Sequence, residues 1–104
     1  ITGGGLYKNL PRVFPNNLQA RISKNSWNIP NLFKYIHQKG NLNDKEMFEV
    51  FNMGIGLIAV IDAENTTSVE QICNELGENI YPLGLSEKGK QAIRIEGTWK
   101  CDWP

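Results

Sequence analysis

The sequence lacks a long hydrophobic run, an excess of charge and a framework of cysteines. No apolar run approaches the roughly 20 residues that a membrane-spanning helix needs, and no signal peptide is visible. Eleven basic residues balance eleven acidic ones, so the clustered positive surface that binds nucleic acids or membranes is not expected. The two cysteines, Cys73 and Cys101, form no CxxC pair, which indicates reduced thiols. These absences predict a cytoplasmic protein without a nucleic-acid or membrane partner.

The patterning that is present predicts a sheet with helices packed on it. Residues 18–24 alternate between apolar and polar, as do residues 91–96, and both patterns are typical of half-buried strands. Residues 55–61, IGLIAVI, are apolar on both faces and predict a central strand that is covered on both sides. A further strand, with Pro82 at an edge or a bulge, is expected within residues 79–87. With the helices described next, this pattern predicts one domain of the α+β class.

Three helices are predicted from their capping residues and apolar faces. The first runs from a cap at Asn28 to Gly40, with Pro30 in its first turn. The second begins with a capping box of Asn43 and Glu46. The third has a box of Thr67 and Glu70, and it ends at Gly77. Each of these helices has an apolar face that can pack on the sheet.

The stretch ITGGGLYKNLPR is the first candidate site. Gly3, Gly4 and Gly5 precede a short helical segment, because Pro11 disfavours the helical conformation at Leu10. A glycine loop at a helix N-terminus presents free N–H groups and binds phosphate or another anion. The side chains that would assist are Lys8, Asn9 and Arg12. The structural alternative is a flexible turn between a strand and a helix, since the loop lacks the Lys-Ser/Thr ending of a Walker motif.

The stretch FNMGIGL is the second candidate. Asn52, Gly54 and Gly56 lie where a helix passes into the most apolar strand, and alternating glycines there allow a ligand or a neighbouring strand to approach the backbone. On the structural interpretation, Asn52 is a left-handed C-cap residue. The spacing is not GxGxxG, so no dinucleotide site is predicted.

Other reactive side chains give no catalytic constellation. His37 is the sole histidine and is expected at the surface or boundary of its helix, with no acidic cluster that would make a metal site. Cys73 lies on an apolar helix face and is expected to pack in the core. Trp99 and Trp103 are compatible with burial, with partner binding or with a loose end. No catalytic residue and no metal ligand is assigned.

Four stretches taken together resemble one enzyme family. ITGGGLYKNLPRVFP, SWNIPNLFKYIHQKGNL, EMFEVFNMGIGLIAVI and YPLGL, in this order, are similar to the carboxy-terminal part of aminoimidazole ribonucleotide synthetase, also called phosphoribosylformylglycinamidine cyclo-ligase. The resemblance covers residues 1–96, an incomplete carboxy-terminal domain, and leaves residues 97–104 as a tail of uncertain structure. The fold that it implies is an α/β/α layered sandwich with a mixed sheet.

The resemblance also implies an activity. Family members use ATP and Mg²⁺ to activate the amide oxygen of formylglycinamidine ribonucleotide, and ring closure then yields aminoimidazole ribonucleotide for purine biosynthesis. They are homodimers of two-domain chains. By resemblance, a phosphate of ATP or of the substrate would be cradled by Gly3, Gly4 and Gly5. The side chains of Asn9 and Arg12 would support that loop or reach the anion. The neighbouring wall of the cleft would be shaped by Asn52, Gly54 and Gly56.

The parts that the family adds before Ile1 are absent from this sequence. They include a histidine, the first two-fifths of the carboxy-terminal domain and the amino-terminal domain that holds Mg²⁺ and most of the ATP. We therefore expect the chain to be a fragment without cyclo-ligase activity alone and with exposed apolar surface. Two alternatives stay open. One is another ATP-using member of the superfamily, such as formylglycinamidine synthetase, thiamine-phosphate kinase or selenophosphate synthetase. The other is a sensor module that binds a phosphorylated metabolite without turnover.

Overall fold

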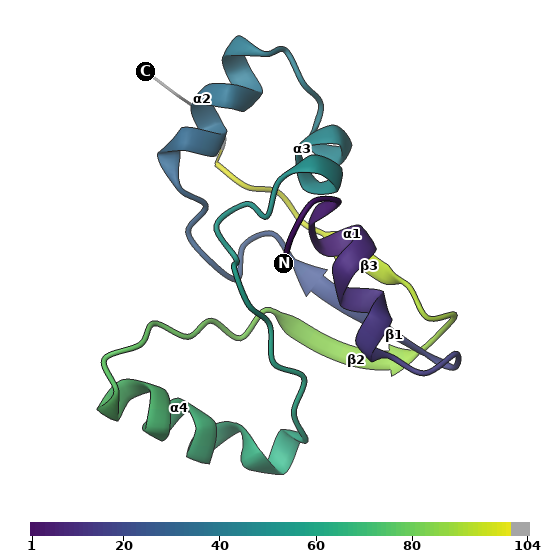
Figure 1. Cartoon of the computed structure of the whole chain (residues 1–104), viewed down its shortest axis with the longest axis vertical. Helices are drawn as coiled ribbons and strands as arrows, with labels where there is room; N and C mark the ends of the chain where they lie inside the picture. The colour runs from purple at the N-terminus through teal and green to yellow at the C-terminus, as the bar shows by residue number, and fades with distance from the viewer. Residues whose placement is uncertain (101–104) are drawn as a thin grey trace.

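The computed structural model describes residues 1–100. Figure 1 shows the helices and strands in chain order, and their bounds are α1 Gly5–Asn9, η1 Leu10–Val13, β1 Leu18–Ser23, α2 Asn31–Lys39, α3 Asp44–Val50, η2 Ala63–Asn65, α4 Thr66–Glu75, β2 Gly84–Lys88 and β3 Ile93–Glu96. Of the tail expected at residues 97–104, residues 101–104, with Cys101 and Trp103, lie outside the described residues.

The sheet has three strands in the order β2-β1-β3. β1 pairs with β2 in the antiparallel sense, with Ala20 opposite Ser86, and with β3 in the parallel sense, with Ile22 opposite Ile95. The sheet is therefore mixed, and the predicted α+β class is confirmed.

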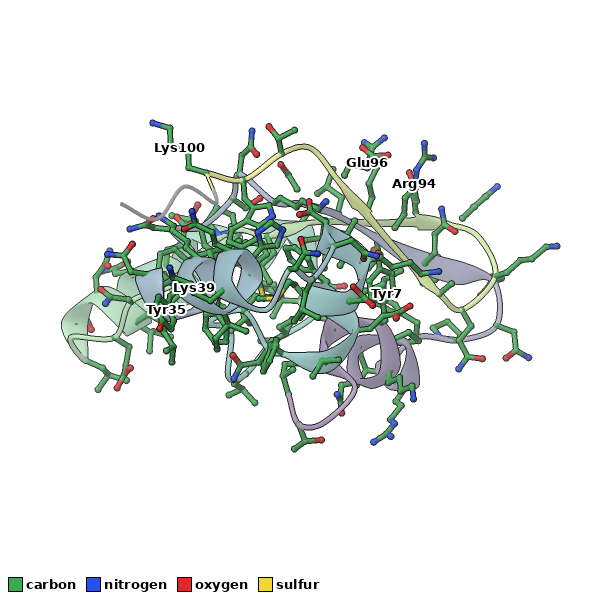
Figure 2. The ribbon with its side chains drawn as sticks, turned by 90° about the horizontal axis from the view of Figure 1, so that it is seen from above. Tyr7, Tyr35, Lys39, Arg94, Glu96 and Lys100 are labelled. Carbon is green, nitrogen blue, oxygen red and sulfur yellow. The ribbon has the colours of Figure 1, made fainter. Side chains whose placement is uncertain are left out.

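One face of the sheet is buried and the other is polar. Ala20 and Ile22 of β1 are buried, as their alternation predicts. On the opposite face, the Gln19 amide donates to Glu87 at 2.9 Å. In Figure 2, Arg94 and Glu96 project from β3 on the side away from Tyr7 of α1, and their charged groups pair at 2.7 Å. These side chains make that face of the sheet largely polar.

The core lies between the sheet, α1 and α3. Its largest fully buried side chains are Leu6, Met47, Phe48 and Met53. The Trp27 ring meets Phe48 edge-on, with 6.4 Å between ring centroids, a geometry that aromatic pairs favour. The core thus joins α1 and α3 to β1.

Two of the predicted helix ends are confirmed. α1 ends after five residues and the chain continues in the tighter η1, which contains Pro11. At α3, Asn43 accepts from the Glu46 N–H and the Glu46 carboxylate accepts from the Asn43 N–H, both at 2.9 Å. This is the predicted capping box.

Two predicted caps are wrong. Helix α2 begins at Asn31, and Pro30 occupies the N-cap position that Asn28 was expected to fill. The turn η2 leads directly into α4 with Asn65 as N-cap, so the box of Thr67 and Glu70 does not form. The 3₁₀ turn η2 runs directly into α4, so the N-cap of α4 lies upstream of Thr67.

The predicted central strand at residues 55–61 is also wrong. These residues have no strand assignment, and the expected strand within residues 79–87 is paired only from Gly84 onward. A strand needs neighbours to accept its hydrogen bonds, and the only described partners of the sheet are β1, β2 and β3. The segment is apolar enough for a central strand, but no described strand lies beside it.

Helix α4 lies apart from the sheet and from α1–α3 (Figure 1), and it buries no residue. Cys73, expected in the core, is only half-buried for this reason. Within residues 1–100, no helix has the length and hydropathy to cross a bilayer.

Candidate functional site at the glycine loop

The glycine loop combines left-handed backbone with close packing. Gly4 has φ 96° and Gly5 has φ 62°, conformations that glycine adopts without steric cost. A Cβ at Gly5 would clash with the Phe48 carbonyl oxygen and lie 2.8 Å from that of Phe51. Gly5 is buried, so its lack of a side chain lets α1 approach the end of α3. Gly3 is exposed, and a Cβ there would meet nothing within 4 Å.

The Asn9 side chain makes hydrogen bonds that hold the glycine loop in one conformation. Its side-chain N–H₂ group donates to the carbonyl oxygens of Gly5 at 2.7 Å, Thr2 at 3.1 Å and Gly3 at 3.4 Å. Its amide oxygen accepts from the Thr2 hydroxyl at 3.1 Å. With these carbonyls turned toward Asn9, the loop has a fixed conformation before any ligand arrives.

The amides of the loop divide into paired and unpaired groups. The Gly5 N–H donates to Thr2 at 3.2 Å, whereas those of Gly3 and Gly4 have no acceptor among residues 1–100. Two free amides beside left-handed glycines can hold an anion. Lys8 lies in the last turn of α1 and Arg12 in the last turn of η1, both exposed.

The second glycine segment contacts the start of the chain. The Ile1 nitrogen donates to the Gly56 carbonyl at 2.7 Å, and Gly5 packs on the residues that precede Asn52. The Asn52 side chain accepts from the Gly54 N–H at 2.8 Å, a turn typical of asparagine. Asn52 is not a left-handed C-cap, because Phe51 takes the cap position and Met53 has the positive φ, 55°.

The close approach at the second segment is to protein. Gly54 has φ 95°, and a Cβ there would lie 2.5 Å from Pro30 Cδ. Gly56 is exposed, with open space where a side chain would be. The Trp27 indole N–H donates to the Met53 carbonyl at 2.9 Å. The segment therefore packs on Pro30 and Trp27, and its last glycine, Gly56, is open.

Comparison with known proteins places these glycines in a family. A family model described as "AIR synthase related protein, C-terminal domain" matches residues 1–96. The chain belongs to this family. Its relatives include phosphoribosylformylglycinamidine cyclo-ligases. The enzyme of Pseudothermotoga lettingae is 43% identical, over 91% of this chain and 28% of that protein. The enzyme of Neisseria meningitidis is 44% identical, over 82% of this chain and 25% of that protein. The cyclo-ligase of Bacillus cytotoxicus is 43% identical over 86% of this chain and 26% of that protein. The chain spans about a quarter of the length of these relatives.

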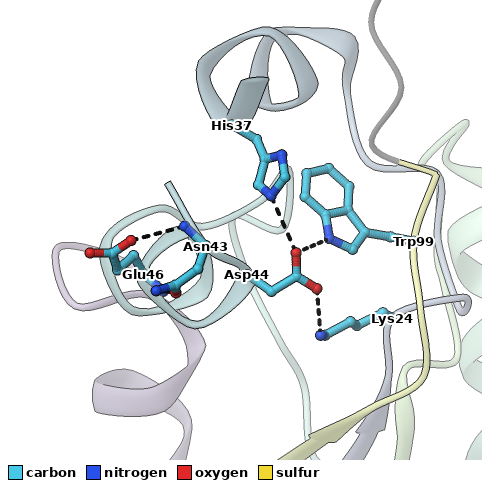
Figure 3. A network of polar contacts seen from close by, with 6 residues as sticks. All are labelled: Lys24, His37, Asn43, Asp44, Glu46 and Trp99. Atoms are coloured by element: carbon cyan, nitrogen blue, oxygen red, sulfur yellow. Dashed lines mark hydrogen bonds and ion pairs between the residues drawn. The ribbon is translucent and has the colours of Figure 1, made fainter. Parts of the chain in front are cut away.

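A second polar cluster includes a residue outside the part that matches the AIR synthase-related family. Figure 3 shows the Asp44 carboxylate with three side chains directed at it. Lys24 Nζ donates to Oδ2 at 2.9 Å, the Trp99 indole N–H donates to Oδ1 at 3.0 Å, and His37 Nε2 lies 3.4 Å from Oδ1. Trp99 also meets the ring of Phe48 edge-on at 6.1 Å. Trp99 thus contacts α2, α3 and the core.

The pKa of Asp44 reflects these partners. Burial acts to raise it, but the hydrogen bonds from Lys24 and Trp99 and the electrostatic effects of Lys24 and His37 outweigh burial and lower the pKa below its usual value. The sequence predicts His37 near a helix end, but nothing in it links positions 24, 37, 44 and 99. The one local signal is an acidic residue in the first turn of α3.

The described residues suit a phosphate better than a metal ion. Residues 1–100 contain no group of three or more His, Cys, Asp or Glu side chains that could hold a metal ion. The free amides of Gly3 and Gly4 fit a phosphoryl oxygen.

Proposed function

We propose that this chain is part of a phosphoribosylformylglycinamidine cyclo-ligase, the ATP-dependent enzyme that converts formylglycinamidine ribonucleotide to aminoimidazole ribonucleotide in purine biosynthesis. The observation that carries the proposal is the match of residues 1–96 to the AIR synthase-related carboxy-terminal domain, supported by relatives named as cyclo-ligases at 38–44% identity. The chain spans about a quarter of those relatives, so turnover requires the rest of the enzyme. We include a homodimer and a cytoplasmic location in the proposal.

In this proposal, the glycine loop binds a phosphoryl group of ATP or of the substrate ribose. The N–H groups of Gly3 and Gly4 donate to its oxygens, Gly5 lets the loop sit against α3, and Asn9 fixes the loop. Lys8 and Arg12 add positive charge, and Asn52, Gly54 and Gly56 form the neighbouring wall. Preorganised donors of this kind stabilise charge that develops on a phosphoryl group without reorganising during the reaction.

When bound, ATP would supply the phosphoryl group that activates the amide oxygen, and Mg²⁺ would neutralise the charge of the phosphates. Both are held mainly by parts of the enzyme outside this chain. The residues of the chain bind and orient the anion, and none of them is assigned a proton-transfer step.

A chimera tests the proposal. Residues 1–96 replace the matching stretch of the P. lettingae cyclo-ligase, and turnover with ATP and formylglycinamidine ribonucleotide is measured. Arg12→Gln should raise the KM for one of the two phosphate-bearing substrates about tenfold, because one cation near the anion is lost. Arg21→Gln removes the same charge from the polar face of the sheet and should leave both KM values unchanged. An inactive, folded chimera, or equal KM values for the two variants, would contradict the proposal. The isolated chain should show no turnover.

A further inference from the structure

The connection between β2 and β3 crosses the start of β1. These two strands flank β1, so residues 89–92 pass from one of its edges to the other. Backbone hydrogen bonds hold both ends of the crossing. The Gly89 N–H donates to the Asn17 carbonyl at 3.0 Å, and the Ala20 N–H donates to the Ala92 carbonyl at 3.0 Å. The crossing therefore lies against the residues that join η1 to β1.

Gln91, within this crossing, has a backbone conformation that residues with a side chain seldom adopt. Its φ is 41°, in the left-handed region, where the Cβ lies too close to the following carbonyl oxygen. Gly89, two residues earlier, would adopt that region without steric cost, but its φ lies elsewhere. A strained conformation persists only where the surrounding contacts hold it, so the contacts of the Gln91 side chain need an explanation.

The Gln91 side chain reaches across to η1. Its amide nitrogen donates to the Phe14 carbonyl at 2.9 Å and to the Pro11 carbonyl at 3.4 Å, positions 77 and 80 residues earlier in the chain. These two carbonyls lie on either side of Arg12 in the sequence. The left-handed residue of the crossing therefore ties the sheet to the turn that carries Arg12.

The middle of η1 has little support of its own. It is a single 3₁₀ turn, whose hydrogen-bond geometry is poor, and Pro11 near its start has no N–H to donate. The first residue of the turn and its C-cap are buried, but Val13 is 65% exposed and Arg12 is exposed as well. Packing therefore holds the two ends of the turn, and the Gln91 amide holds the carbonyls around Arg12.

We propose that Gln91 is a positioning residue for Arg12: its amide fixes the backbone from which the guanidinium reaches the anion at the glycine loop. This inference rests on the proposed function, which gives Arg12 its place near that anion. Since η1 continues α1 without a break, α1 joins the turn to the glycine loop at one end and Gln91 joins it to the sheet. A cation that is held in advance loses less conformational freedom when the anion binds.

The experiment measures the kinetics of the chimera with substitutions at position 91. Gln91→Met keeps the length and neutrality of the side chain but removes the donor. It should raise about threefold the KM that Arg12→Gln also raises, and leave kcat and the other KM unchanged. Gln91→Asn adopts the left-handed region more readily but is one methylene too short, so it should raise the same KM without lowering the Tm. The matched control is Gln38→Met at an exposed position on α2, which should change neither KM.

A double variant tests whether Gln91 acts through Arg12. If it does, Arg12→Gln combined with Gln91→Met should have the KM of Arg12→Gln alone, about tenfold above that of the parent chimera, whereas independent residues would give a product of about thirtyfold. That product would overturn the inference. So would a Gln91→Met chimera that keeps the parent KM while Arg12→Gln raises it.

A measurement without turnover separates this inference from the proposed function. The Phe14 N–H donates to the Pro11 carbonyl at 3.1 Å, within the turn that Gln91 supports. In the isolated chain, hydrogen exchange at this amide should be about tenfold faster in Gln91→Met than in the parent. Faster exchange together with an inactive, folded chimera would leave the support of η1 by Gln91 standing and refute the proposed activity instead. Unchanged exchange would overturn the inference whatever the chimera does.

Discussion

Residues 1–55 and residues 56–100 have similar apolar patterns but different burial. Every buried residue among those described lies at or before Ile55. In the first region, the closed region, α1, β1, α2 and α3 pack around Phe48. In the second, the open region, α4 and the segment before it make few contacts with the rest of the chain. An amphipathic pattern therefore predicts which face of a helix or strand can pack against another element. It does not predict whether that other element is present.

The largest expected effect is in the closed region. Phe48→Ala should lower the free energy of unfolding by about 3–5 kcal/mol, because it removes a fully buried ring and leaves a cavity. Ile72→Ala on α4 is the matched truncation in the open region, and it should change the free energy of unfolding by less than about 0.5 kcal/mol. Denaturant titration of the isolated chain measures both. Equal losses for the two variants would refute the distinction between the regions.

Gly5→Ala should cost about 2–3 kcal/mol. The new Cβ meets the carbonyl oxygens of Phe48 and Phe51 at a backbone φ of 62°, which strains a residue with a side chain. Gly3→Ala, two positions earlier in open space, is the control and should change stability by less than about 0.5 kcal/mol. A fully stable Gly5→Ala protein would show that α1 can move away from α3 at no cost.

Trp99→Ala should cost about 1–2 kcal/mol, because it removes a hydrogen bond to Asp44 and an edge contact with Phe48. Trp99→Phe keeps a ring against Phe48 but loses the hydrogen bond, so its loss should be smaller. Thermal unfolding orders the three proteins. If the alanine variant matches the parent chain, Trp99 contributes nothing to the closed region.

The smallest effect is the acid sensitivity of Asp44. Since its pKa is lowered in the folded protein, its contribution is present above the unfolded pKa of about 3.9 and is lost as the pH falls through the folded value. Asp44 is partly exposed, so solvent screening keeps the contribution below about 1 kcal/mol. Asp44→Asn should reduce the fall in stability between pH 5 and 3, measured by denaturant titration. An unchanged pH dependence would contradict the role of this carboxylate.

Local signals predicted much of the fold. The alternation of β1, the capping box of Asn43 and Glu46 and the short α1 before Pro11 depend on neighbours a few positions away, and all three are confirmed. The family was also evident, because the glycine segments have specific residues in a specific order. The proximity of these segments followed from that resemblance, and their role in binding stays a prediction.

Nonlocal contacts explain the failures. The pattern of residues 55–61 is correct for a buried strand, but strand formation depends on partners that no property of the segment reveals. The cluster around Asp44 joins it to residues 20 and 55 positions away, so no spacing rule could find it. The burial of Gly5 against the Phe48 carbonyl similarly depends on how α1 meets α3.

The position of β1 at the centre of the sheet has a consequence for the order of events during synthesis. Both of its neighbours come from residues 84–96, so more than half of this sequence must leave the ribosome between β1 and the strands that complete it. Until then β1 has two open edges in a nascent chain that already carries the apolar residues 55–61. Cells that make this protein therefore face a window in which unpaired edges invite aggregation, and chaperone binding would be most useful within it.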